Sequence, residues 1–151
     1  MGYIPEDAMW YLADVILEKR IESDPRSVVH INRLLVRADS REDAHEKALL
    51  LGRQGEHSYE NTDGKTVTVT FRGLGELNVI HEELEHGAEL SYQELVGLSE
   101  EQVRALSKAK PELGVFAPRQ VSKGPNYMPK SVMEDLRKAG FDESDLQNPT
   151  A

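Results

Sequence analysis

Apolar and polar residues alternate along two segments near the start of the chain. In residues 10–22 one side of an extended chain is wholly apolar and the other is mixed, and the content of Tyr, Val, Ile and Trp favours a strand over a helix. Residues 27–39 alternate in the same way after a β-branched start. The polar Glu-Ser-Asp-Pro-Arg stretch between them is typical of a turn. We therefore expect two long strands joined as an antiparallel hairpin.

The spacing changes to that of a helix in residues 40–52. Ser40 stands where an N-cap is expected, and Asp43 three residues later comes close to a capping box. Gly52 or Gly55 can end this helix in a left-handed conformation. The apolar stripe consists of Ala44, Ala48 and Leu51. Because two of its members are small, the helix could approach a sheet closely.

A second hairpin is predicted around Asp63-Gly64, which is a strong turn signal. Its arms are residues 56–61 and 65–72, and the second arm should bury its valines and turn its threonines toward water. The glycines at 73 and 75 then loosen the chain. Residues 77–86 fit an acidic helix that Gly87 stops, and residues 88–92 could return as a strand.

Two short helices are expected in the last third of the chain. The first starts at Ser99, with Gln102 closing a capping box, and the second is capped by Ser131. Together these elements predict an α+β fold, an antiparallel sheet of four to five strands with one main helix packed on one face (a ββαββ core), plus C-terminal helices. We expect a compact domain over residues 1–110, a Pro/Gly-rich connector over 111–130, and a short helix with a frayed end over 131–151.

Residues 9–96 resemble a bacterial family catalogued as domain of unknown function 4288. The resemblance rests on the opening Trp-Tyr, the long strand pair, the capped Ala-rich helix and the late Gly-x-Glu at Gly87 and Glu89. It implies a small compact bacterial domain. No activity comes with the resemblance, so it implies no catalytic residue.

Composition excludes several classes of site. The 151-residue chain has no cysteine, which removes disulfides, thiolate chemistry and cysteine-based zinc sites. It shows no secretory signal and no apolar run of the roughly 20 residues that a membrane helix needs. We expect a cytoplasmic protein without membrane contact.

The net charge of −9 is spread unevenly along the chain. Residues 1–102 hold 10 basic and 21 acidic residues, whereas residues 103–138 hold 8 basic and 3 acidic residues. An acidic body repels nucleic acid phosphates, so nucleic-acid binding by the body is not expected. The basic segment packs on the acidic body in the favoured interpretation, and RNA binding is its alternative.

The acidic stretch around His81 and His86 looks by composition like a metal site. These histidines are five residues apart, which is about 140° of rotation on a helix and opposite faces on a strand. Neither regular structure lets both bind one ion. The weak metal candidates are His57, Glu60, His81 and Glu85. Nothing in the sequence brings them together, and we expect no metal or other cofactor.

One helix covers only one face of a sheet, so the other face is the best candidate for a binding site. Trp10 lies on the mixed side of the first strand and could anchor a partner there. The candidate binding residues are Trp10, Asp14, Glu18, His57, Tyr59, Glu89 and Tyr92. No nucleophile elbow, phosphate loop or dinucleotide fingerprint is present, and no catalytic residue is assigned.

Three functions remain open on these grounds. The leading hypothesis is a non-enzymatic protein-interaction or regulatory module, of immunity type in size and charge, which binds a protein partner or itself. The first alternative is a small-ligand-binding or metal-dependent hydrolytic protein. The second alternative is RNA binding through residues 103–138.

Overall fold

The computed structural model describes residues 9–118 and 123–140. It confirms an α+β fold with a four-stranded antiparallel sheet and three α-helices. The frayed end expected at the C-terminus falls on residues 141–151, outside the described part. In chain order the elements are β1 (Trp10–Ile21), β2 (Ser27–Arg37), α1 (Arg41–Gln54), β3 (His57–Glu60), β4 (Thr66–Val79), α2 (Glu100–Leu106), the 3-10 helix η1 (Lys110–Glu112) and α3 (Lys130–Lys138).

The chain forms two compact units. The first holds the four strands, α1 and residues Gly124–Lys130, and the second holds α2, η1 and most of α3. Within the described residues, no helix is long and apolar enough to cross a membrane.

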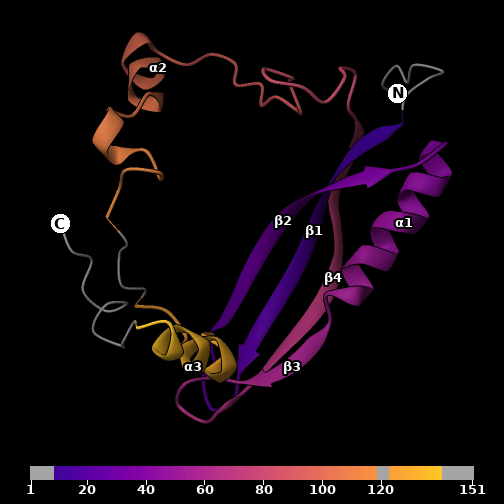
Figure 1. The fold of residues 1–151 in the computed structure, drawn as a ribbon. Coiled ribbons are helices and arrows are strands. Elements are labelled where there is room, and N and C mark those ends of the chain that lie inside the picture. Colours follow the sequence, from indigo (N-terminus) through magenta and orange to yellow (C-terminus); the bar gives the residue numbers. More distant parts are fainter. Residues whose placement is uncertain (1–8, 119–122, 141–151) are drawn as a thin grey trace. The chain divides into compact units, whose positions relative to one another are not determined.

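The sheet has the strand order β2-β1-β4-β3, with β1 and β4 in the middle (Figure 1). β1 pairs with β2 in one unbroken register, but its pairing with β4 shifts twice, beside Val15 and Leu17. Gly73 lies at the second shift with a φ of 125°, a conformation that favours glycine. The glycines at 73 and 75 therefore do not end the second arm of the hairpin. They form bulges within a strand that continues to Val79.

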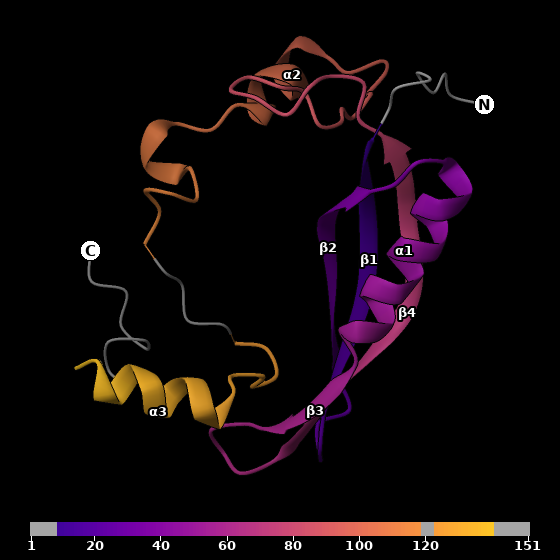
Figure 2. The same cartoon turned by 45° about the vertical axis from the view of Figure 1, so that its right-hand side comes forward.

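One face of the sheet carries the buried core, and we call it the covered face. Ala44 and Ala48 of α1 are fully buried there in one cluster with residues from β1 and β2. Figure 2 shows α1 running along the sheet. Gly52 brings α1 still closer to β4, because a Cβ at this position would lie 2.3 Å from Cε1 of Phe71. The strand members of the cluster are Tyr11, Ala13, Val15 and Val36.

The ends of the helices agree in part with those predicted from the sequence. Oγ of Ser40 accepts a hydrogen bond from the Asp43 N–H at 3.1 Å, which confirms the predicted N-cap. The capping box between Ser99 and Gln102 is also present. The predicted left-handed end of α1 is wrong, because Gly55 caps it with a φ of −75°. Ser131 was also misplaced as a cap, because α3 already begins one residue earlier.

Residues 77–92 differ most from the sequence-based prediction. Leu77 and Val79 belong to the end of β4 and pack against the core cluster, so they do not start a helix. From Ile80 to Leu98 there is neither helix nor strand, and the predicted strand at 88–92 is also wrong. The physical reason is that residues 81–86 are all exposed. An acidic segment with no apolar face to bury gains little from forming a helix.

Candidate functional site

The face opposite the covered face, which we call the open face, carries exposed apolar side chains. It presents the even-numbered residues of β1, including Trp10, Asp14 and Glu18, all three half-buried. Their direct partners on β2 share this face because paired antiparallel residues point the same way. The large apolar residues of β2 on this face are Val29, Ile31 and Leu35, exposed by 52%, 57% and 45%.

Each of the three predicted binding residues on β1 lies close to an arginine. Nε of Arg33 is 3.6 Å from Oδ1 of Asp14, and Nε of Arg20 is 3.6 Å from Oε1 of Glu18. The Arg37 guanidinium lies 5.8 Å from the centre of the Trp10 ring. Arginine and tryptophan concentrate binding energy at protein interfaces. The open face therefore combines an apolar strip on β2, interrupted by Arg33, with charged and aromatic groups.

Two other predicted residues lie on the opposite side of the sheet. His57 pairs with Val69 and Tyr59 pairs with Val67, and both valines are buried in the covered face. The structure therefore does not bring His57 and Tyr59 together with Trp10. The Nδ1 atom of His57 lies 2.9 Å from the Gly55 carbonyl oxygen, and its ring stacks on Tyr59.

The remaining candidates lie in or near the irregular stretch after β4. The Glu89 N–H donates to Oε2 of Glu82 at 2.7 Å, and Tyr92 is 78% exposed. Glu60 ends β3, and its Oε1 lies 4.0 Å from Nζ of Lys130. With no helix at 81–85, the helical spacing that would pair His81 with Glu85 does not apply. In the part of the chain that the structure describes, no three acidic or histidine side chains form a metal-binding group.

A second site lies at the turn between β3 and β4, where a distant segment is bound. We call residues Gly124–Lys130 the clasp. Asn61 is the centre of this site and is only 1% exposed. Its Oδ1 accepts from the N–H groups of Asp63 at 3.0 Å and Lys65 at 2.8 Å, and its Nδ2 donates to the Asn126 carbonyl at 2.9 Å. One side chain thus orders the turn and binds the clasp.

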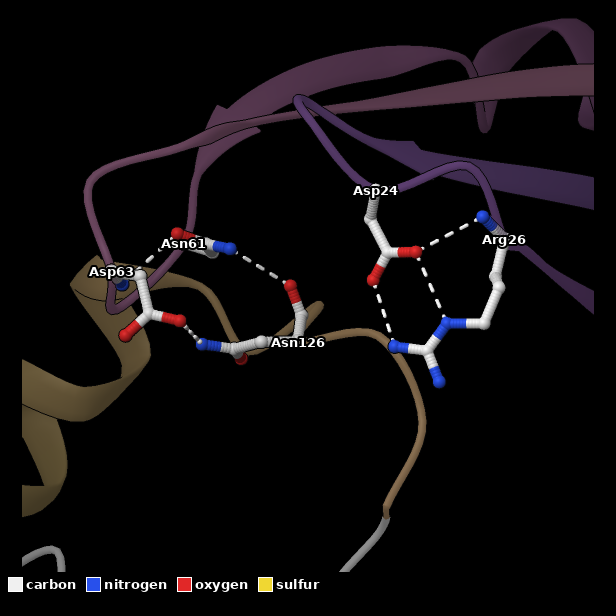
Figure 3. A network of polar contacts seen from close by, with 5 residues as sticks. All are labelled: Asp24, Arg26, Asn61, Asp63 and Asn126. Atoms are coloured by element: carbon white, nitrogen blue, oxygen red, sulfur yellow. Dashed lines mark hydrogen bonds and ion pairs between the residues drawn. The ribbon is translucent and has the colours of Figure 1, made fainter.

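Asn126 completes this network from the side of the clasp. Its Nδ2 lies 2.8 Å from Oγ1 of Thr62 and 2.9 Å from Oδ2 of Asp63, and Figure 3 shows Asn126 facing Asn61 and Asp63. The next two residues of the clasp bind through their carbonyl groups. The Tyr59 hydroxyl donates to the Tyr127 carbonyl at 2.5 Å, and the Thr62 N–H donates to the Met128 carbonyl at 3.1 Å. The β3–β4 region thus binds the backbone of an extended segment through hydrogen bonds.

Side chains of the first hairpin contact the aromatic residue of the clasp. The Tyr127 ring packs edge-on against His30, with centroids 5.3 Å apart, and Nζ of Lys19 lies 4.6 Å from its centre. Burial lowers the pKa of His30, and the Lys19 charge lowers it further. Burial also lowers the pKa of Lys19 and raises the pKa of Tyr59. The surroundings of His30 and Tyr59 therefore favour the neutral forms of both side chains.

A compact ion pair closes the turn between β1 and β2. Ser23 in this turn has a φ of 68°, and Asp24 accepts from the backbone and from the guanidinium of Arg26 (Figure 3). These hydrogen bonds hold the pKa of the Asp24 carboxyl below its usual value. The pair is a turn-stabilising feature on the surface, and its position fits a structural role.

The sequence alone did not point to the clasp. The Asn-Thr-Asp-Gly turn could be recognised, but nothing in it indicates that Asn61 binds a segment some 65 positions away. A pattern of local spacing carries no information on such a contact. The only usable indication was the Pro-Asn-Tyr-Met-Pro stretch, whose prolines favour an extended chain.

The polar groups of the clasp site contact backbone carbonyl and N–H groups, and the acidic groups of the open face lie beside arginines.

Comparison with known proteins adds the family. Residues 10–92 match the family model described as a domain of unknown function (DUF4288), and this range includes all four strands and α1. No curated protein and no solved structure matches the chain. Because the family model matches more than half of its residues, the chain belongs to the DUF4288 family.

Proposed function

We propose that the ββαββ core, with its main helix packed on one face, works as a non-enzymatic protein-interaction or regulatory module. The partner would contact the open face and β2. The observation that carries this proposal is the exposure of Val29, Ile31 and Leu35 on one strip of β2. Apolar side chains gathered on one surface favour association with another apolar surface. An immunity-type role in a bacterial cytoplasm fits the size and the acidic charge of the chain.

The charged and aromatic groups of the open face support a protein partner. Arginine and tryptophan are enriched at protein interfaces, and charged groups beside apolar ones provide specificity. Trp10, Arg33 and Arg37 supply these groups on the open face. The second unit adds exposed apolar residues of its own, since α2 has no buried residue and Leu106 is 60% exposed.

Affinity capture with purified full-length protein tests the proposal. The wild-type chain is compared with Ile31→Asp, which places a charge in the apolar strip, and with Leu50→Asp, which makes the same type of change at an exposed residue of α1. A bacterial protein retained by the wild type and by Leu50→Asp, but lost with Ile31→Asp, is the expected result. Circular dichroism shows that each variant is folded. Equal capture by all three proteins, or none by any, would contradict the proposal.

The two alternatives have measurements of their own. Stoichiometric zinc or manganese in the purified protein, lost on His81→Ala, would favour the metal-dependent alternative. Binding of RNA that weakens steeply with salt, and is lost when lysines at 108, 110 and 123 are replaced by glutamine, would favour the RNA alternative.

A further inference from the structure

Among the residues that the structure describes, no strand pairs with the outer side of β2. β2 is the first strand in the sheet order, so it pairs with β1 on one side only. It is 11 residues long and contains no proline, glycine, lysine or acidic residue. Its pairing with β1 has no bulge. Proteins commonly protect sheet edges with such features, and a long regular edge without them is suited to pairing with another strand.

The hydrogen bonds at the ends of β1 show which groups face this edge. The Ala38 N–H donates to the Met9 carbonyl on the β2 side, and the Ile80 N–H donates to the Trp10 carbonyl on the β4 side. In a regular antiparallel ladder, the backbone N–H and C=O groups of successive residues point alternately to the two sides of the strand. The even-numbered residues of β2 therefore bond to β1. The odd-numbered residues, which include Val29, Ile31 and Leu35, direct their N–H and C=O groups to the free edge.

We propose that β2 pairs antiparallel with β2 of a second copy of this chain, with Asn32 on the two-fold axis. This inference rests on the proposed interaction function and names the partner that would bind the free edge of β2. The two sheets would join into one continuous sheet. With Asn32 on the axis, all of β2 overlaps its copy, because this residue is the midpoint of Ser27–Arg37.

The arrangement of side chains favours this register over its neighbours. It sets Val29 opposite Leu35 of the second copy, and Ile31 opposite Arg33 of the second copy. Outward-directed residues face each other, as an antiparallel pair requires. Moving the axis to Arg33 would place two arginines opposite each other, which is unfavourable. Moving it to Ile31 would end the overlap at Leu35 and leave Arg37 without a partner strand residue.

Charge and space also fit a second copy. Each chain carries a net charge of −9, yet β2 has no acidic residue, so two acidic chains can meet here without placing carboxylates together. The positive charge of Arg33 lies beside Asp14 of its own chain. Helix α1 contacts β4 most and β2 least among the three strands that it touches. The helix therefore leaves the edge of β2 accessible.

Light scattering coupled to size-exclusion chromatography tests the proposal on the full-length 17.0 kDa chain. Two double variants at exposed positions form a matched pair. Val29→Lys with Leu35→Lys places lysines opposite each other in the proposed register, whereas Val29→Lys with Leu35→Glu places opposite charges there. We expect wild type and the Lys/Glu variant to be dimers. The Lys/Lys variant should be monomeric, with a dimer Kd raised by about tenfold or more.

The outcomes separate this inference from the proposed function. A wild-type protein that stays monomeric up to millimolar concentration, or a folded Lys/Lys variant that dimerises as well as the Lys/Glu variant, would overturn self-pairing. A monomer that captures another protein through Ile31 would retain the interaction function and reject only the second copy. Binding of an acidic peptide to the β2 edge of a monomer would likewise retain the interaction function and reject only the second copy. Circular dichroism confirms the fold of each variant before its mass is interpreted.

Discussion

The covered face of the sheet has two halves that are closed by different means. Over one half lies α1, which follows β2 directly in the chain and packs through small residues such as Ala44 and Ala48. Over the other half lies the clasp, which comes from more than thirty residues beyond the end of β4 and binds through Asn61, Tyr59 and Asn126. The first contact is apolar and local. The second is polar and distant in sequence.

This difference predicts unequal stability for the two halves. Burial of apolar surface is the largest favourable contribution to folding, and α1 shares a fully buried cluster with β1 and β2. A hydrogen bond contributes only about 1 kcal/mol net, and the clasp also loses the freedom of a long connecting segment. We expect the clasp to open while the sheet and α1 remain folded.

Gly52→Val should destabilise the half that α1 covers by about 3 kcal/mol. A Cβ at this position would lie 2.3 Å from the Phe71 ring, so helix and sheet must separate or the ring must leave its place. Chemical denaturation followed by circular dichroism measures the loss. The matched control is Gly114→Val, because a Cβ there meets nothing within 4 Å. Similar losses for both variants would contradict close packing at Gly52.

Asn61→Ala should cost about 2 kcal/mol and act mainly on the half that the clasp covers. The substitution leaves the N–H groups of Asp63 and Lys65 without their acceptor and removes the donor to Asn126. Asn78→Ala is the control, because Asn78 lies exposed on β4. Hydrogen exchange should accelerate at the Thr62 amide, which donates to the clasp, while amides of the β1–β2 ladder keep their protection. Uniform acceleration across the sheet would show that the two halves unfold together.

Tyr59→Phe should weaken closure of the clasp by about 1 kcal/mol. It removes the hydroxyl that donates to the Tyr127 carbonyl but keeps the ring. The Thr62 amide again reports the change, with faster exchange expected. Tyr92→Phe makes the same substitution at a side chain that is 78% exposed, and it should leave this exchange rate as in the wild type. An unchanged rate in Tyr59→Phe would remove this hydrogen bond from the description of the clasp.

Mild acid should produce the smallest effect. The folded pKa of His30 lies below its usual value of 6.5, so the folded state binds fewer protons than the unfolded state as the pH falls through that value. The stability linked to neutral His30 is therefore complete above about pH 6.5 and declines toward the lower folded pKa. The groups facing it are Lys19 and the Tyr127 ring. The melting temperature should be lower at pH 5.5 than at pH 7.5, and this difference should be smaller in His30→Gln. The same difference in both proteins would exclude His30 as its source.

Much of the sheet could be predicted because its information is local. Alternation placed β1, β2 and the second hairpin, and Val67 and Val69 are buried as expected while Thr66 and Thr68 are exposed. The prediction failed beyond Arg72, because bulges at glycines let β4 continue where the pattern suggested an end. It failed again at residues 77–86, where helical spacing of three leucine and isoleucine residues coincided with the end of a strand. Burial, not spacing, decides such cases.

The candidate site divides in the same way. Trp10, Asp14 and Glu18 could be placed on one face from alternation alone, and the structure has all three on the open face. His57 and Tyr59 could not be placed, since the face of a strand relative to a distant strand depends on register and bulges. The clasp required knowledge of a contact between Asn61 and Asn126. No property of either residue in isolation specifies the other.

Binding of the clasp also determines how the stretch from Gln93 to Lys123 is connected to the rest of the chain. Because Gly124–Lys130 is bound to the β3–β4 turn, this stretch is anchored at both ends and is not a free tail. A single proteolytic cut within it would convert the clasp into a separate fragment, held only by noncovalent contacts and released on dilution. Lengthening one of the segments beside its helices would cost little, since doubling the length of a loop adds only about 0.6 kcal/mol to its closure. The fold could therefore accept an inserted domain here while a nick at the same place would divide the protein in two.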